Sequence, residues 1–145
     1  MPLTSDRDIA DLLSTTRSIA LIGASAKAER PSHRVLAFLV QAGYQVYPVN
    51  PGLAGSEICG RPVFSSLSEI PVLIDMVDVF RQPHYLADIV EQAIEIEAGA
   101  IWTQLGVVDE QAARRAEAAG MVVVMDKCPA IELPRLQAAG AMPTI

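Results

Sequence analysis

The fold is decided by residues 19–36, which read IALIGASAKAERPSHRVL. The apolar run 18–22 ends at Gly23, which is typical of a buried strand that enters a tight turn. Pro31 then opens an amphipathic segment, and proline suits the first helical position because its missing N–H would have no partner there. A strand, a glycine turn and a helix start in this order favour an anion site at the helix N-terminus.

The turn lacks the three glycines of the G-x-G-x-x-G dinucleotide-binding pattern. Ser25 and Ala28 stand where the second and third glycines would be. The second strand ends at Asn50, where an NAD protein usually has Asp or Glu for the ribose hydroxyls. No G-x-x-x-x-G-K-[ST] pattern occurs, which argues against a P-loop nucleotide hydrolase. An NAD(P)-binding redox protein is therefore only an alternative.

Composition narrows the class of protein. With 145 residues, 51% of them hydrophobic, we expect a single domain over residues 1–145 with a full core. No apolar run reaches the roughly 20 residues of a membrane span, and the N-terminus is no secretory signal. We therefore expect a cytoplasmic protein with no membrane association. A net charge of -6 disfavours nucleic-acid binding, and two cysteines are too few for a disulfide framework.

Strand and helix patterns alternate along the chain. Helical spacing predicts helices over 6–15, 31–43, 83–98 and 109–119, with a final helix or turn from Cys128 and a loose tail after Ala138. Apolar runs predict strands over 18–22, 45–49, 73–80, 100–103 and 121–125, with a short edge strand at 61–65 and a helical turn at 66–70. This alternation predicts an α/β fold, with a parallel sheet of about five to six strands and helices on both faces.

Ligands of such sheets bind beyond the carboxyl ends of the strands. The residues that the sequence places there follow a strand or open the next helix: Gly23, Ala24, Ser25, Lys27, Arg30, Ser32, Arg34, Asn50, Pro51, Phe80, Arg81, Gln104, Leu105, Gly106, Asp126, Lys127 and Cys128. Five of them are basic, in a chain whose net charge is negative. Together with a glycine that allows close backbone approach and a helix N-terminus, they predict a phosphate or pyrophosphate site. A glycine turn without a ligand is the alternative.

Four segments carry a resemblance when they are taken in order: IALIGASAKAERPSHRV, YQVYPVNPGLAGSEICGRPVFSSLSEIP, IDMVDVFRQP and AIWTQLGVVDEQAARRAEAAGMVVVMDKCPAIE. From about Arg17 to Leu136, the chain resembles the small stand-alone CoA-binding proteins. These are similar to the N-terminal CoA-binding domain of the succinyl-CoA synthetase alpha subunit. The resemblance implies a Rossmann-like fold with coenzyme A or an acyl-CoA across the carboxyl edge of its sheet.

The resemblance also implies a role for each loop. The phosphates would meet the turn Gly23–Ser25 and the helix start at Ser32, with Arg30 and Arg34 neutralising their charge. Asn50 and Pro51 would flank the nucleotide, Phe80 and Arg81 would border the adenine or pyrophosphate, and residues 104–106 would border the pantetheine arm.

Catalytic machinery is not expected in this chain. The synthetase carries its phosphorylated histidine in a second domain and binds nucleotide on a beta subunit, and neither has a counterpart here. His33 and His84 stand at helix starts without a recognisable acid partner, so solvated or capping roles are expected. The cysteines and histidines lack metal-ligand spacing, and no metal is expected. A CoA-binding subunit of a multi-chain acyl-CoA enzyme is the second alternative, and self-association stays open.

The sequence allows two interpretations for each of Cys128, Asp75 and Asp78. Cys128 precedes a helix and follows Lys127, which favours a thiolate and makes a disulfide with the CoA thiol conceivable. The alternative is a buried, inert thiol. Asp75 and Asp78 lie inside an apolar strand; general-base work is open to them, but hydrogen bonds to neighbouring loop backbone are expected, since a buried carboxylate needs a partner. Cys59, in a loop, is expected to be incidental.

Overall fold

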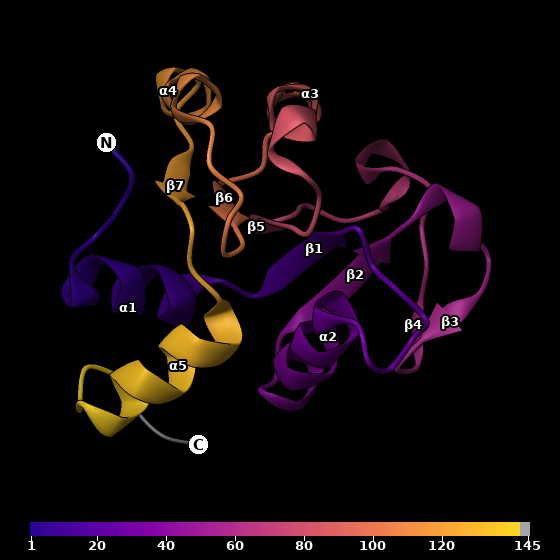
Figure 1. Cartoon of the computed structure of the whole chain (residues 1–145), viewed down its shortest axis with the longest axis horizontal. Coiled ribbons are helices and arrows are strands. Elements are labelled where there is room, and N and C mark those ends of the chain that lie inside the picture. The colour runs from indigo at the N-terminus through magenta and orange to yellow at the C-terminus, as the bar shows by residue number, and fades with distance from the viewer. Residues whose placement is uncertain (143–145) are drawn as a thin grey trace.

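A five-stranded parallel sheet lies between two layers of helices (Figure 1). The computed structural model describes residues 1–142, so the last three residues of the tail lie outside the described part. The strand order is β2 (Gln45–Val49), β1 (Ser18–Ile22), β5 (Met76–Val79), β6 (Ala100–Thr103) and β7 (Val122–Val124). The prediction of an α/β fold with a parallel sheet is confirmed.

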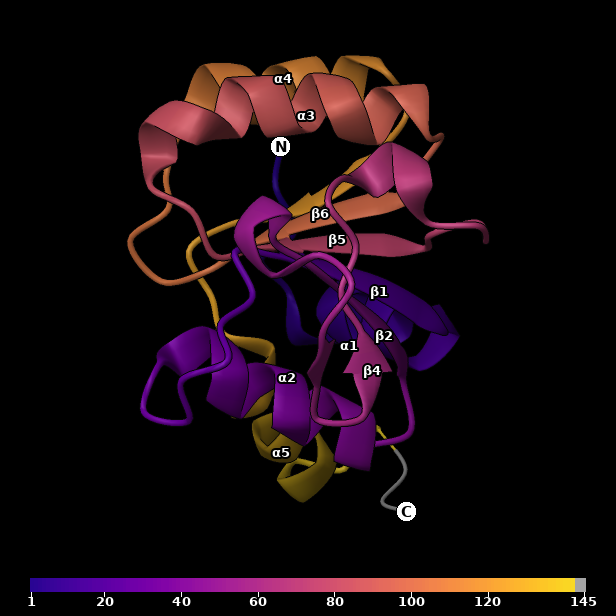
Figure 2. The same cartoon turned by 90° about the vertical axis from the view of Figure 1, so that its right-hand side faces the viewer.

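Helices cover both faces, as predicted. One layer consists of α1 (Asp6–Thr15), α2 (Pro31–Gln41) and α5 (Pro129–Ala138), and the other of α3 (Leu86–Glu95) and α4 (Glu110–Ala118) (Figures 1 and 2). Residues of β1 alternate between the layers: Ile19 and Leu21 belong to the core cluster of α2, whereas Ala20 and Ile22 belong to that of α3. Burial on both faces explains why the strand is an unbroken apolar run.

The direction of the chain across the sheet reverses next to β1. From β1 the chain passes through α2 to β2 at the sheet edge, and it then returns to β5 on the other side of β1. Ile22 and Val79 are register partners, so the carboxyl ends of β1 and β5 are adjacent. This is the switch point at which open parallel sheets bind their ligands.

Two predicted strands differ from the structure. The strand expected over 73–80 begins only at Met76; Leu73 is 78% exposed, although Ile74 is buried in the core. The edge strand expected at 61–65 is only partly formed: β4 (Arg61–Pro62) pairs antiparallel with β3 (Glu57–Ile58), and Phe64 makes a single parallel bridge to Val49 of β2 at the edge of the main sheet. The two residues between β3 and β4, Cys59 and Gly60, have positive φ, which favours a tight hairpin turn at this point.

Short 3-10 turns connect the longer elements. They are η1 (Pro51–Leu53), η2 (Leu67–Glu69) and η3 (Pro83–Tyr85). The helix expected over 83–98 therefore starts as a 3-10 turn and becomes α-helical at Leu86. Within residues 1–142, no helix has the length and apolar character that crossing a membrane requires.

Candidate functional site

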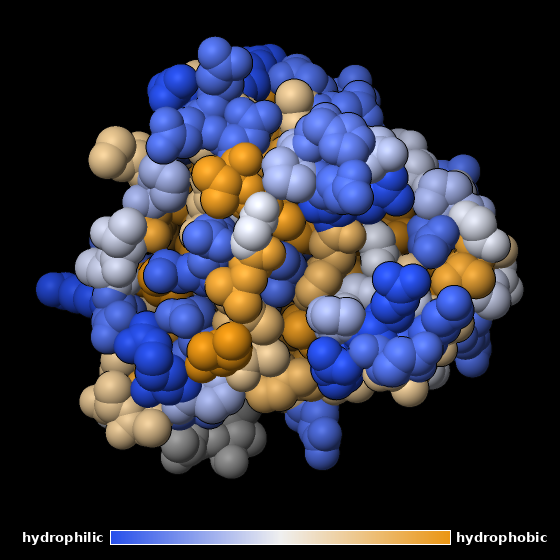
Figure 3. All heavy atoms as spheres, in the orientation of Figure 1, coloured by the Kyte–Doolittle hydropathy of each residue, from blue (hydrophilic) through white to orange (hydrophobic). Residues whose placement is uncertain are grey.

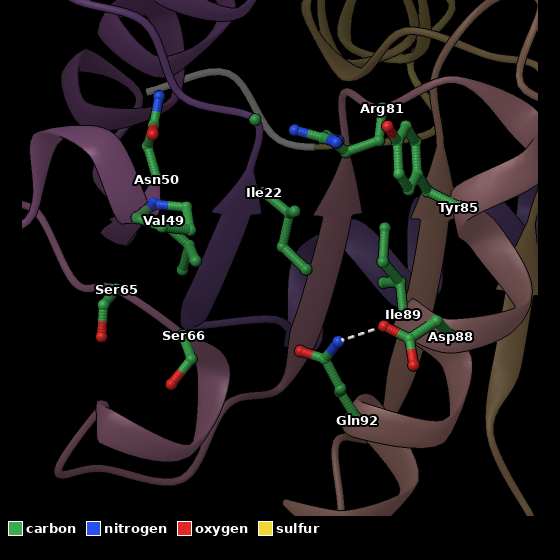
Figure 4. A pocket seen from close by; sticks show the side chains of 12 residues that line it. Ile22, Val49, Asn50, Ser65, Ser66, Arg81, Tyr85, Asp88, Ile89 and Gln92 are labelled. Atoms are coloured by element: carbon green, nitrogen blue, oxygen red, sulfur yellow. Dashed lines mark hydrogen bonds between the residues drawn. The ribbon is translucent and has the colours of Figure 1, made fainter.

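Two cavities lie beside each other at the carboxyl ends of β1, β2 and β5. The loop cavity, of about 420 Å³, lies over the turn after β1 and is lined by Gly23, Ala24, Ser25, Lys27, Arg30, Pro31, Ser32, Asn50, Phe80 and Arg81. The α3 cavity, of about 190 Å³, is lined by Ile22, Gly23, Val49, Asn50, Pro51, Ser65, Ser66, Arg81, Tyr85, Asp88, Ile89 and Gln92 (Figure 4). The two share Gly23, Asn50 and Arg81, so one elongated ligand can occupy both.

Gly23 is required by a close approach of two loops. Its φ is +90, and a Cβ at this position would lie 2.2 Å from the carbonyl oxygen of Phe80. The amides of Gly23 and Ala24 both donate to the carbonyl of Val49. The glycine therefore allows the turn after β1 to pack against the turn after β5, and these two amides are already used within the protein.

Other amides of the same turn are free for an anion. Within residues 1–142, the backbone N–H groups of Ser25 and Ser32 have no protein acceptor. Ser32 is the second residue of α2 and is buried, so its N–H group is one of the unpaired donors of the helix N-terminus. Lys27 and Arg30 are exposed at the cavity rim. Free amides, a helix N-terminus and two cations together make a phosphate-binding environment.

Asn50 connects the turn after β1 to the turn after β2. Its Nδ2 donates to the carbonyl of Ala24 at 2.8 Å, and its Oδ1 accepts from the N–H of Gly52 at 2.8 Å. An aspartate could accept from Gly52, but its second oxygen would face the Ala24 carbonyl without a proton. The amide therefore has a structural reason to stand where NAD proteins have an acidic residue.

Arg81 is held over an aromatic ring between the two cavities. Its guanidinium carbon lies 4.1 Å from the centroid of the Tyr85 ring, a cation–π contact that orients the side chain. Figure 4 shows Arg81 and Tyr85 at one end of the α3 cavity and the hydrogen-bonded pair Asp88 and Gln92 along its wall. The positive charge of Arg81 is thus available to a ligand in either cavity.

Sequence reasoning missed part of the α3 cavity. Ser65 and Ser66 come from the segment before η2, and Tyr85, Asp88 and Gln92 come from η3 and α3. The spacing of Asp88 and Gln92, four residues apart on one helix face, was the available signal.

Seven of the residues expected at the site line neither cavity: Arg34, Gln104, Leu105, Gly106, Asp126, Lys127 and Cys128. Arg34 donates to the carbonyl of Glu29 within its own turn. Leu105 is 61% exposed, and the N–H of Gly106 donates to Asp126. Residues 104–106 thus lie at the end of β6, beyond the two cavities.

Asp78 and Gln104 form a buried polar pair on neighbouring strands. Gln104 Nε2 donates to Asp78 Oδ1 at 2.8 Å, and Oδ2 has no partner among the described residues. Burial raises the pKa of Asp78 to about 7, although the bond from Gln104 opposes this. The expected backbone partner is confirmed for Asp75, which accepts from the N–H groups of Arg17 and Ser18. For Asp78 the side chain of Gln104 bonds Oδ1, and the backbone of Val79 also lowers its pKa.

Cys128 is a buried thiol at the N-terminus of α5. It is 9% exposed, and burial raises its pKa even though backbone groups of the helix start oppose the shift. The prediction that this position favours a thiolate is therefore wrong, because loss of hydration outweighs the helix N-terminus. The alternative of a buried thiol describes the residue correctly.

Comparison with known proteins identifies a family that matches this chain. Residues 17–134 match the family model described as a CoA binding domain. The chain belongs to this family. It is 37% identical over 124 residues to the uncharacterized protein YneT of Bacillus subtilis, covering 86% of this chain and 90% of that protein. A hypothetical protein of Pyrococcus horikoshii has the same fold, with a TM-score of 0.88 and 38% identity, over 94% of this chain and 96% of that one.

A larger enzyme subunit shares part of the CoA-binding domain. The chain is 33% identical over 86 residues to the alpha subunit of an ADP-forming acetate–CoA ligase of Pyrococcus furiosus. The match covers 57% of this chain and 19% of that subunit. The resemblance seen in the sequence is thus confirmed at the level of the family, which supports association with CoA. Within residues 1–142, no group of three or more His, Cys, Asp or Glu side chains is arranged to hold a metal ion.

Proposed function

We propose that this CoA-binding domain binds coenzyme A or an acyl-CoA across the carboxyl ends of β1 and β5, without catalytic activity of its own. One observation carries the proposal beyond the family match. In a chain of net charge -6, Lys27, Arg30 and Arg81 line one cavity with the unpaired amide of Ser32. Coenzyme A is strongly anionic, and such a cluster matches its phosphates.

The two cavities suggest how the ligand lies. In this proposal the pyrophosphate occupies the loop cavity, where the cations and the N-terminus of α2 meet. The adenine nucleotide extends into the α3 cavity, whose wall contains apolar Ile22, Val49 and Ile89 and the polar pair Asp88 and Gln92. Arg81 borders both cavities and can form an ion pair with a phosphate group in either one. The pantetheine arm runs in the other direction, towards residues 104–106 at the end of β6.

Titration of the purified chain tests the ligand. CoA, acetyl-CoA, 3′-dephospho-CoA, NAD and NADP are compared by calorimetry and by thermal shift, because a ligand that binds only the folded state must raise Tm. We expect CoA and acetyl-CoA to bind and NAD not to bind. Binding of NAD or NADP without binding of CoA would instead favour the alternative of a nicotinamide-dependent redox protein.

A second candidate is a CoA-binding subunit of a multi-chain acyl-CoA enzyme. The similarity to the acetate–CoA ligase alpha subunit favours it. The chain is purified from its source cells under mild conditions, and the assembly is sized and tested for nucleotide-dependent acyl-CoA formation. A single species of monomer or homo-oligomer size without this activity supports the stand-alone binding protein. A stable complex that has the activity, and loses it when this chain is removed, supports the subunit.

A further inference from the structure

A cysteine stands at the tip of the hairpin formed by β3 and β4. The two turn residues, Cys59 and Gly60, both have left-handed backbone, with φ of 51 and 77. Such a turn favours glycine or asparagine at its first position, because the Cβ of other residues crowds the backbone there. Cys59 holds this position with an exposed side chain, so the turn presents its thiol to solvent.

The thiol of Cys59 faces the imidazole of His33. Cys59 Sγ lies 3.6 Å from His33 Nε2, and His33 Nδ1 lies 2.9 Å from the carbonyl oxygen of Ser25. A carbonyl oxygen can only accept, so Nδ1 carries the proton and donates to Ser25. In the neutral ring, Nε2 then presents its lone pair to the S–H of Cys59.

These three groups are the parts of an activated nucleophile: a thiol, a base within hydrogen-bond distance, and a third group that orients the base. Ser25 and His33 lie eight residues apart, in the turn after β1 and the first turn of α2, whereas Cys59 comes from the β3–β4 hairpin 26 residues further along the chain. His33 is half-buried, which limits its motion, whereas Cys59 is open to reagents.

We propose that Cys59 is a reactive thiol that exchanges with low-molecular-weight disulfides, with His33 as its base. In the exchange, Nε2 of His33 takes the proton of Cys59, and Sγ attacks one sulfur of the disulfide. A bond forms between Sγ and that sulfur while the original S–S bond breaks. The other sulfur leaves as a thiolate and takes the proton from His33. The sulfur of Cys59 is oxidised and the leaving sulfur is reduced, so the disulfide itself is the oxidant.

This thiol is separate from the proposed CoA site. Neither Cys59 nor His33 lines the loop cavity or the α3 cavity, so the exchange is tested without CoA. The two sites adjoin, because three residues that line the loop cavity contact or precede His33: Ser25 accepts from its ring, Arg30 accepts from its N–H, and Ser32 precedes it in the chain. The buried Cys128 supplies an internal comparison in the same chain.

Oxidised glutathione is the probe for the test, and the rate of mixed-disulfide formation is followed by intact mass. The native chain and Cys128→Ser should gain one glutathione at the same rate, and Cys59→Ser should gain none. The variant His33→Asn places an amide N–H where Nδ1 donates to Ser25 but removes Nε2. It should react at least about tenfold more slowly than the native chain, the loss expected on removing a general base.

Two control measurements distinguish loss of the base from loss of the fold. Circular dichroism confirms that each variant is folded, and His33→Gln, which also lacks a basic nitrogen, replaces His33→Asn if that variant does not fold. The Cys128→Ser chain unfolded in urea gives the rate of Cys59 without its base, because Cys59 is then its one thiol, and the folded Cys128→Ser chain should exceed this rate. Equal rates for the native chain and the His33 variants, or for folded and unfolded chain, would show an ordinary exposed thiol and overturn the proposal.

Discussion

The side-chain amide of Asn50 bridges two turns by donating to the carbonyl of Ala24 while accepting from the N–H of Gly52. Replacing Asn50 with Asp keeps the second bond and sets a carboxylate oxygen against the Ala24 carbonyl. We expect the free energy of unfolding to fall by about 1–3 kcal/mol, the usual cost of leaving a partner unsatisfied. Urea denaturation measures this loss, and CoA titration should show weaker binding. Unchanged stability in Asn50→Asp would contradict the bridging role.

Gly23 and Gly43 form a matched pair for substitution by alanine. Both have positive φ, but a Cβ on Gly23 would meet the Phe80 carbonyl at 2.2 Å whereas one on Gly43 would have nothing within 4 Å. Gly43→Ala should lose about 1–2 kcal/mol of stability from its left-handed backbone alone. Gly23→Ala should lose clearly more or fail to fold, because the two loops must separate. Equal losses in urea denaturation would mean that the contact with Phe80 is easily relaxed.

Arg81 and Arg34 are expected to differ in their effect on CoA binding. Arg81 lies at the junction of the two cavities, whereas the guanidinium of Arg34 is bonded to the Glu29 carbonyl outside both. Arg81→Glu should weaken CoA binding by tenfold or more, since a charged hydrogen bond contributes about 1.5–3 kcal/mol. Arg34→Glu should weaken it less. Calorimetry at two salt concentrations checks both, and the reverse order would place the phosphates away from Arg81.

Asp78 should give the protein a pH-dependent stability. Burial raises its pKa from the ordinary 3.8 to about 7, so between these values the folded chain holds a proton that the unfolded chain has released. The stability contributed by the neutral carboxyl is complete below about pH 4 and is lost as the pH rises to about 7, by at most about 1.4 kcal/mol per pH unit.

The variant Asp78→Asn isolates this contribution, because it removes the titrating group and keeps the oxygen that accepts from Gln104. Urea denaturation of both proteins over this pH range gives the difference in unfolding free energy, in which other titrating groups cancel. The native chain should lose stability relative to Asp78→Asn as the pH rises. Parallel curves would show that Asp78 titrates alike in the folded and unfolded chains.

Cys128 should not form a disulfide with the thiol of bound CoA. The thiolate is the reactive form, and burial raises the pKa of this thiol. In a Cys59→Ser background, which removes the exposed thiol, CoA should raise Tm equally with and without reductant. If the rise needs oxidising conditions and is absent from the variant that also carries Cys128→Ser, a CoA disulfide at Cys128 forms after all.

Much of the fold could be predicted because its central strands are buried on both faces. The bounds of β1 and β2 agree with the apolar runs 18–22 and 45–49. The run 73–80 was misleading at its start, because Leu73 is apolar and yet exposed. The β3–β4 hairpin was missed because Cys59 is not a residue that indicates a turn with positive φ.

The candidate site was predictable only where it follows from strand direction. Parallel strands bring the turns after β1, β2 and β5 to one edge, so Gly23, Asn50 and Arg81 could be grouped from sequence. How α3 packs on the sheet decides that Tyr85 and Asp88 complete the second cavity, and periodicity does not give that position. The partners of Asp78 and Cys59 depend likewise on side-chain contacts between segments far apart in the sequence.

The contact between Gly23 and the Phe80 carbonyl has a kinetic consequence. It fixes the spacing of the turns after β1 and β5, and Val49 and Asn50 hold the first of them from the other side. A ligand arriving at the loop cavity meets donors that are already in place and waits for no rearrangement. Association should therefore be fast and similar for CoA and its acyl derivatives, so that discrimination among them arises in their residence times.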